Sequence, residues 1–157
     1  MVAELHADQA LGARDPEWCT QAGFAYRFDW GPNGLRTLAP VSDVVVIVDV
    51  LRFTSAVSAA VEGGTTVFPY RWADDGAPAY AADHDAQLAG RREHGELSLS
   101  PTDLLSVSTP LRLVLPSPNG SALSFAARDH GARHVLAGCL RNATATARLA
   151  RRLAGAT

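Results

Sequence analysis

Hydrophobic residues along the chain occur in short apolar runs that alternate with segments of helical spacing. Asp43–Val50 is an almost continuous β-branched run, too short for a typical helix and apolar on both faces. This is typical of a central parallel strand that helices cover on both sides. Thr54–Glu62 follows with small and apolar residues at helical spacing, and Gly63-Gly64 ends it. The chain therefore begins a strand–helix unit at Asp43.

The same alternation continues to the end of the chain. It predicts strands at Thr65–Tyr70, Leu111–Leu115 and His134–Ala137, helices at Ala77–Ala89 and Ala143–Leu153, and a polar loop at Ser98–Thr102. Asn119–Ser121 is predicted to be a turn that caps a further helix through about Asp129. Repeated strand–helix units indicate an α/β fold, three-layer α/β/α with a mostly parallel sheet. We expect residues 1–157 to form a single α/β domain.

The N-terminal part has a different pattern. Phe24–Trp30 alternates aromatic and non-aromatic positions, which predicts a half-buried strand with one aromatic face. Gly31–Gly34 then predicts a turn. The aromatic side chains belong either to the core or to an interface, such as that of a possible homodimer, and we expect the core.

Three strand–helix turns carry most of the candidate chemistry, because ligands of open α/β sheets bind at the carboxyl ends of the strands. Asp49 ends an otherwise apolar strand, where a charge is costly to bury without a partner. Its carboxylate is either a functional group or half of a structural pair with Arg52. The two readings stay open on the sequence alone.

The second turn is Pro116–Ser121, and the third is Gly138–Asn142. In the second turn, Gly120 permits a close backbone approach, and free N–H groups at the start of the following helix could hold an anion. The same residues are also compatible with an ordinary capping turn. In the third, Asn142 is suited to cap a helix, and Arg141 could reach a ligand anion or solvent. Together the turns favour a small polyanionic ligand, most simply a phosphate ester, with a divalent cation shared between Asp49 and the phosphate.

Composition narrows these possibilities. All 14 basic residues are arginine, which excludes Schiff-base, pyridoxal-phosphate and P-loop lysine chemistry, so arginine, metal and backbone N–H groups must hold any phosphate. The net charge of −2 argues against nucleic-acid binding, and no apolar run is long enough for a membrane span. The two cysteines, Cys19 and Cys139, have no metal-ligand spacing and favour a cytoplasmic protein with free thiols. We expect Cys139 to be a packed thiol.

Four segments in order carry a family resemblance: VDVLRFTSAVSAAVEGG, SLSPTDLL, LVLPSPNGSAL and AGCLRNATA. They resemble the 2-phosphosulfolactate phosphatase (ComB) family over roughly two thirds of the chain. The resemblance implies an α/β/α fold and magnesium-dependent hydrolysis of 2-phosphosulfolactate to sulfolactate and inorganic phosphate. It implies Asp49 as the acidic residue at the metal and reaction centre, and Arg52 as the group that neutralises the substrate anion. The substrate-binding residues expected around them are Thr54, Ser100, Ser117, Asn119, Gly120, Ser121, Arg141 and Asn142.

Family members continue past the last helix with an acidic, glycine-containing segment that contributes to the site. We therefore expect residues 1–157 to lack the C-terminal part of the family fold. Two functions remain: a phosphatase of this mechanism acting on 2-phosphosulfolactate or a related phosphorylated hydroxy acid, or a non-catalytic anion-binding or assembly domain. Within the first, attack by a water and a covalent aspartyl-phosphate at Asp49 are both open.

Overall fold

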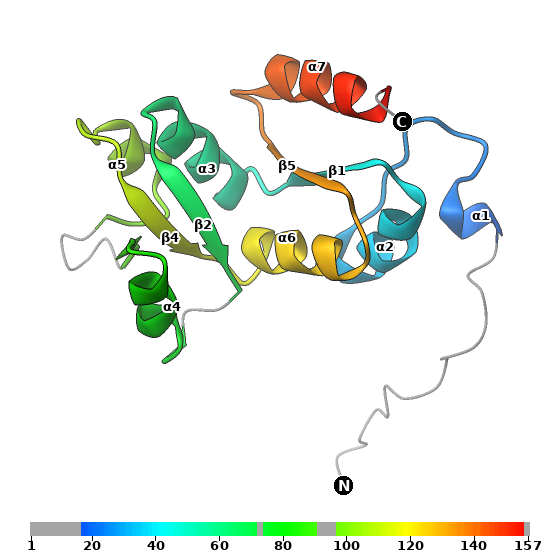
Figure 1. Ribbon diagram of the computed structural model, residues 1–157. Coiled ribbons are helices and arrows are strands. Elements are labelled where there is room, and N and C mark those ends of the chain that lie inside the picture. Colours follow the sequence, from blue (N-terminus) through cyan, green and yellow to red (C-terminus); the bar gives the residue numbers. More distant parts are fainter. Residues whose placement is uncertain (1–16, 72–73, 91–96, 156–157) are drawn as a thin grey trace, which may run out of the picture.

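The computed structural model describes residues 17–71, 74–90 and 97–155 (Figure 1). Helices and strands alternate through most of these ranges, as the hydropathy pattern predicts. The elements are α1 (Glu17–Thr20), α2 (Gly31–Leu38), η1 (Ala39–Val41), β1 (Val44–Val48), α3 (Phe53–Glu62), β2 (Thr66–Tyr70), α4 (Ala77–Asp83), β3 (Gln87–Leu88), α5 (Pro101–Leu105), β4 (Arg112–Pro116), α6 (Gly120–Asp129), β5 (His134–Gly138) and α7 (Ala143–Ala154).

Within the described residues, every strand pairing is parallel, which confirms the α/β class. The strands divide between two small sheets, β1-β5 and β2-β4-β3, where the sequence pattern suggested one. The register of β1 on β5 runs from Val44 opposite His134 to Val48 opposite Gly138. Asp49 and Cys139 directly follow the last pair, so the turns after β1 and β5 leave the sheet side by side.

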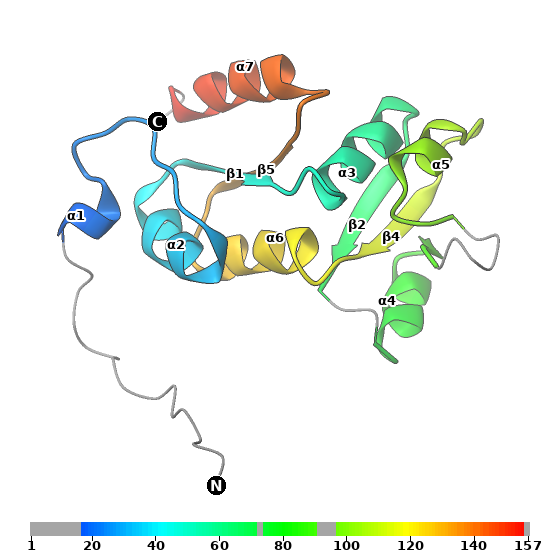
Figure 2. The same cartoon turned by 180° about the vertical axis from the view of Figure 1, so that it is seen from behind.

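Helices cover the β1-β5 sheet on both faces. α7 packs against one face and α6 against the other, which gives three layers in this part of the molecule (Figures 1 and 2). α3 and α6 also contact β2, so these two helices connect the β1-β5 sheet to the β2-β4-β3 sheet. The N-termini of both connecting helices carry candidate site residues.

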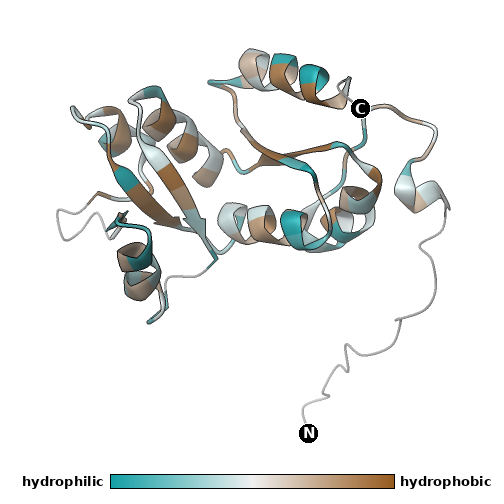
Figure 3. Cartoon of the chain, in the orientation of Figure 1, coloured by the Kyte–Doolittle hydropathy of each residue, from teal (hydrophilic) through white to brown (hydrophobic). Residues whose placement is uncertain are grey.

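Within the described residues, a buried hydrophobic cluster lies between α3, α5 and β4. Phe53, Leu104, Leu113 and Leu115 are its large members, all at most 2% exposed. α3 contributes mainly alanine at its buried positions, and small side chains let a helix approach its neighbours closely. Figure 3 shows the corresponding hydrophobic colouring on α3, β2 and β4. The start of α3, directly after the Asp49 turn, is thus anchored in the core.

The N-terminal predictions were wrong. Phe24–Trp30 lies outside any strand, and α2 begins at Gly31, where the pattern predicted a turn. Pro32 at the first positions of α2 suits a helix start, because its missing N–H would be unpaired there anyway. The aromatic side chains of this segment are exposed, so their expected place in the core is also wrong.

Two other elements differ from prediction. The helix expected over Ala77–Ala89 ends at Asp83, and Gln87–Leu88 pairs with β4 as a short strand. The loop expected at Ser98–Thr102 contains the start of α5 at Pro101. Both differences arise in short segments, where a few residues carry too little periodicity to separate helix, strand and loop. No helix within the described ranges is long and apolar enough to cross a membrane.

Candidate active site

The turn after β1 is fixed by hydrogen bonds to the first turn of α3. The Asp49 N–H donates to Thr54 Oγ1 at 3.1 Å, and the Thr54 N–H donates to the Asp49 carbonyl at 2.9 Å. The Ser55 hydroxyl donates to the carbonyl of Val50 at 2.7 Å. Thr54 is fully buried, so its hydroxyl holds the turn from inside the protein. These contacts fix the position of the Asp49 backbone.

The Asp49 carboxylate is held by the second turn, 71 residues further along the chain. Its Oδ2 accepts a hydrogen bond from the Gly120 N–H at 3.1 Å, at the N-terminus of α6. A carboxylate is favoured there by the helix dipole as well as by the hydrogen bond. No ion pair between Asp49 and Arg52 occurs among the described residues, so the local partner considered from the sequence is replaced by a distant one.

Gly120 has no room for a side chain. A Cβ at this position would lie 2.2 Å from Cδ1 and 2.6 Å from Cγ of Phe53, the first residue of α3. The buried Phe53 ring thus packs directly on the backbone that binds Asp49. The sequence flagged Gly120 for close backbone approach, but Phe53 as the group that approaches it was missed.

The serines of the second turn complete the start of α6. Ser117 Oγ accepts from the N–H groups of Gly120 at 3.2 Å and Asn119 at 3.3 Å. The buried Ser121 hydroxyl donates to the Leu115 carbonyl at 2.9 Å. The sequence suggested that free N–H groups here could bind a ligand anion, but the Gly120 N–H already donates to Asp49 and Ser117. In this structure the anion at α6 is the Asp49 carboxylate itself.

The third turn is closed by the Asn142 amide. Its Oδ1 accepts from the Cys139 N–H at 2.8 Å, and its Nδ2 donates to the Ala137 carbonyl at 2.9 Å. Its side chain makes no capping hydrogen bond to α7. Asn142 occupies the N-cap position of α7, as the sequence suggested, but its side chain ties the turn back to the end of β5.

Cys139 lies in a polar environment that the sequence gave no sign of. Burial raises the pKa of its thiol, but hydrogen bonding with the Asn142 and Arg141 backbone and with the Ser58 and Ser55 side chains outweighs this and leaves the pKa below the ordinary 9.0. Ser55 and Ser58 are three residues apart on α3, and such residues share one helix face. The thiol is 5% exposed and links the third turn to α3.

Two predicted site residues lie in other surroundings. The Arg141 guanidinium forms an ion pair with Glu62, at the C-terminal end of α3, whereas Asp49 precedes the N-terminal end. Ser100 is buried at the start of α5, where its N–H donates to Ser98 Oγ. No hydrogen bond among the described residues connects either side chain to Asp49.

Three groups of the predicted site remain open to a ligand. Within the described residues, Asp49 Oδ1, the Arg52 guanidinium and the Asn119 side chain make no hydrogen bond or ion pair, and Arg52 and Asn119 are exposed. They belong to two adjoining turns, because Gly120 bonds Asp49. One carboxylate oxygen, one cation and one amide therefore lie on these two adjoining turns.

The side chains of this site fit a magnesium ion only if the protein supplies a single carboxylate ligand. No group of three or more histidine, cysteine, aspartate or glutamate side chains suited to a metal occurs in the described part of the chain. Magnesium, however, is commonly bound by one or two carboxylates together with waters and substrate phosphates. Asp49 Oδ1 can serve as such a single carboxylate ligand.

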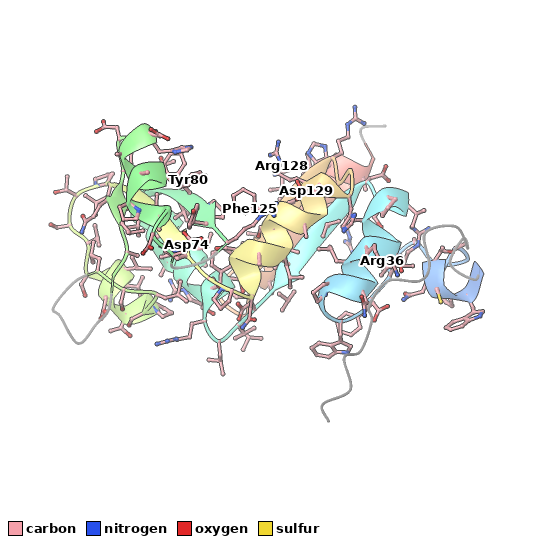
Figure 4. The ribbon with its side chains drawn as sticks, turned by 90° about the horizontal axis from the view of Figure 1, so that it is seen from below. Arg36, Asp74, Tyr80, Phe125, Arg128 and Asp129 are labelled. Carbon is pink, nitrogen blue, oxygen red and sulfur yellow. The ribbon has the colours of Figure 1, made fainter. Side chains whose placement is uncertain are left out.

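Two surface cavities lie apart from Asp49, and neither is lined by it. One of about 470 Å³ lies between α3, β2, α4, α6 and β5 and is lined mainly by apolar residues. In Figure 4, Tyr80 lies on α4, across from Phe125 and Arg128 on α6. The other, of about 480 Å³, is lined by residues between Trp18 and Thr37. The candidate site at Asp49 is therefore separate from these two cavities.

Comparisons with known proteins agree with the motif order along the chain. The model of the 2-phosphosulpholactate phosphatase family matches residues 32–156. A protein of Thermus thermophilus named "Probable 2-phosphosulfolactate phosphatase" is 36% identical over 117 residues, which are 71% of this chain and 49% of that protein. The chain thus spans about half the length of this relative. The matched region includes all three turns, and the chain belongs to the 2-phosphosulpholactate phosphatase family.

Proposed function

We propose that the protein is a magnesium-dependent phosphatase of 2-phosphosulfolactate or a related small phosphorylated hydroxy acid, with Asp49 at its reaction centre. The observation that carries the proposal is the state of the Asp49 carboxylate. Its backbone is fixed by Thr54, one oxygen is fixed by the Gly120 N–H, and the other makes no hydrogen bond within the described residues. Fixed orientation with one open oxygen is what preorganised charge stabilisation requires.

In this proposal, Arg52 and Asn119 bind the substrate anion beside Asp49. The guanidinium is permanently charged and can pair with two oxygens of a phosphate, sulfonate or carboxylate group. Magnesium, held by Asp49 Oδ1, would neutralise charge on the phosphoryl oxygens. Water forms the new bond to phosphorus, the ester oxygen leaves with a proton as the hydroxyl of the acid, and inorganic phosphate is released.

The test is phosphate release from a panel of phosphorylated hydroxy acids that includes 2-phosphosulfolactate, with magnesium and with a chelator. We expect turnover that needs magnesium and is abolished by Asp49→Asn. Asp43→Asn is the matched control, because Asp43 is an exposed carboxylate at the opposite end of the same strand. Retained turnover in a folded Asp49→Asn variant would remove Asp49 from the chemistry.

The second candidate is a non-catalytic anion-binding domain of the same fold. It is favoured by the small set of metal-binding side chains in the described residues. The two functions separate in one comparison. If 2-phosphosulfolactate binds by calorimetry while no member of the panel releases phosphate at any magnesium concentration, the enzyme proposal fails and the binding domain stands.

A further inference from the structure

Among the residues that the structure describes, the N-terminal aromatic segment brings several exposed large apolar side chains close together along the chain. The exposed fractions there are 79% for Trp18, 67% for Phe24, 77% for Tyr26, 65% for Phe28 and 78% for Trp30. Single exposed apolar residues are normal on protein surfaces, but contiguous patches mark interaction sites. The described residues leave these five aromatic side chains, which lie within thirteen positions, largely uncovered.

The segment is held in shape without burying its rings. The Gln21 side chain bonds both the N–H and the carbonyl of Phe28, at 3.0 and 2.8 Å. The Arg27 side chain donates to the carbonyls of Gln21 and Val41. Phe28 and Trp30 meet edge to face, with ring centroids 5.1 Å apart. The surface is thus fixed in advance, which lowers the entropic cost of binding.

The same surface contains both a hollow and protruding rings. The cavity of about 480 Å³ is walled by Trp18, Phe28 and Trp30, and polar groups of Asp29 and Arg36 also line it. Phe24 and Tyr26 lie outside this lining and are exposed. A ring from another molecule can enter the hollow, and a tyrosine hydroxyl would find polar partners there. Figure 4 shows Arg36 on α2, at this end of the molecule.

We propose that this aromatic surface is the interface of a homodimer, in which Tyr26 and Phe24 of each copy enter the partner's hollow. A twofold interface uses one patch twice, so the patch must carry both the protruding group and its receptor, as this one does. Tyrosine and tryptophan are also the residue types that most often dominate binding energy at interface centres.

The available area agrees with a stable dimer. Aromatic side chains carry about 150–250 Å² each, so the five exposed fractions amount to about 700 Å² per copy. A standard interface buries about 800 Å² per partner. The net charge of −2 and the absence of lysine give little repulsion between copies and little attraction to an anionic membrane. A second copy therefore fits this surface better than a lipid.

Light scattering coupled to gel filtration tests the proposal across a wide concentration range. The chain should elute at twice its mass, and Tyr26→Asp, alone or with Phe24→Asp, should shift it to the monomer with unchanged circular dichroism. Leu140→Asp is the control, because Leu140 is 85% exposed but lies between β5 and α7. A monomer at every concentration, or a dimer that Tyr26→Asp leaves intact, overturns the proposal.

Cross-linking tests the placement independently of affinity. Cys19 lines the hollow, so Tyr26→Cys should bring a thiol next to the partner's Cys19. Mild oxidation with diamide should then give a covalent dimer on a non-reducing gel, and Cys19→Ser in the same background should reduce it strongly. A monomeric chain that instead floats with phosphatidylcholine vesicles would show that the patch is a membrane surface, and the dimer would be wrong.

Discussion

A single methyl group at Gly120 should disconnect the two turns that hold Asp49. In Gly120→Ala, the new Cβ would lie 2.2–2.7 Å from three atoms of Phe53, namely Cδ1, Cγ and Cβ. Phe53 is 2% exposed and anchored in the core, so its ring has little freedom to withdraw. The start of α6 must therefore move away from α3, and this lengthens the 3.1 Å hydrogen bond from Gly120 to Asp49.

The expected cost follows from two contributions. Overpacking of a tight contact costs about 1–3 kcal/mol. Loss of a hydrogen bond to a charged group costs about 1.5–3 kcal/mol, and Asp49 is half-buried, which places it near the lower end. Together they amount to about 3 kcal/mol. In a domain of this length that corresponds to a fall in Tm of about 6–12 °C.

Thermal and urea denaturation followed by circular dichroism measure this cost. Gly23→Ala is the matched control, because a Cβ there has no neighbour within 4 Å. It should change stability by less than about 0.5 kcal/mol, since surface substitutions without a specific mechanism usually stay in that range. A double-mutant cycle with Phe53→Ala should show coupling, because alanine lacks Cγ and Cδ1, the two Phe53 atoms nearest the new Cβ. Additive effects, or equal stability of the two alanine variants, would refute the reasoning.

Three further predictions use the same turns. Asn142→Ala should lower the free energy of unfolding by about 2 kcal/mol, more than loss of an ordinary helix cap, because two backbone groups lose their partner. Urea denaturation measures this loss, and Asn142→Asp should recover part of it. Because the native environment lowers the pKa of Cys139, its thiolate stabilises the fold increasingly as the pH rises from the native pKa towards the unfolded value. The Tm difference between wild type and Cys139→Ala should therefore be constant below the native pKa and grow towards pH 9, and a difference that stays constant up to pH 9 would contradict this. Arg141→Ala should leave KM and stability nearly unchanged, because the exposed ion pair of Arg141 with Glu62 contributes under about 1 kcal/mol. Arg52→Ala should raise KM, and a larger rise in KM for Arg141→Ala than for Arg52→Ala would make Arg141 the substrate arginine.

The predictable part of the fold is the part in which periodicity and glycine act locally. β1 and α3 lie within one or two residues of their predicted bounds, because a β-branched run and a helical segment ended by Gly63 each specify their own element. The segment Phe24–Trp30 has the alternating pattern that predicts a strand, and it still forms no strand. A strand needs a partner, and that requirement is not local. The division into two sheets escaped prediction for the same reason.

The candidate site also has a part that the sequence predicts locally and a part that depends on distant contacts. The sequence located the three turns, because each carries polar residues in the first few positions after an apolar strand. It could not identify the contacts between turns, such as Gly120 with Asp49 or Cys139 with Ser55. Local reasoning therefore offered Arg52 as the partner of Asp49, although the structure uses a backbone N–H from a distant turn.

That distant contact has a consequence for how a phosphate could be held. The favourable position at the N-terminus of α6 is taken by Asp49, so a substrate phosphate beside it would face a carboxylate. Two unit charges of like sign 4 Å apart repel by about 4 kcal/mol at an effective dielectric constant of 20. Arg52 offsets one negative charge, but a phosphate ester carries up to about two at neutral pH. With no lysine in the chain, a divalent cation between Asp49 Oδ1 and the phosphate is the simplest way to restore the balance. This charge balance at the turn built around Gly120 is the reason that we propose a metal-dependent site and not a simple anion pocket.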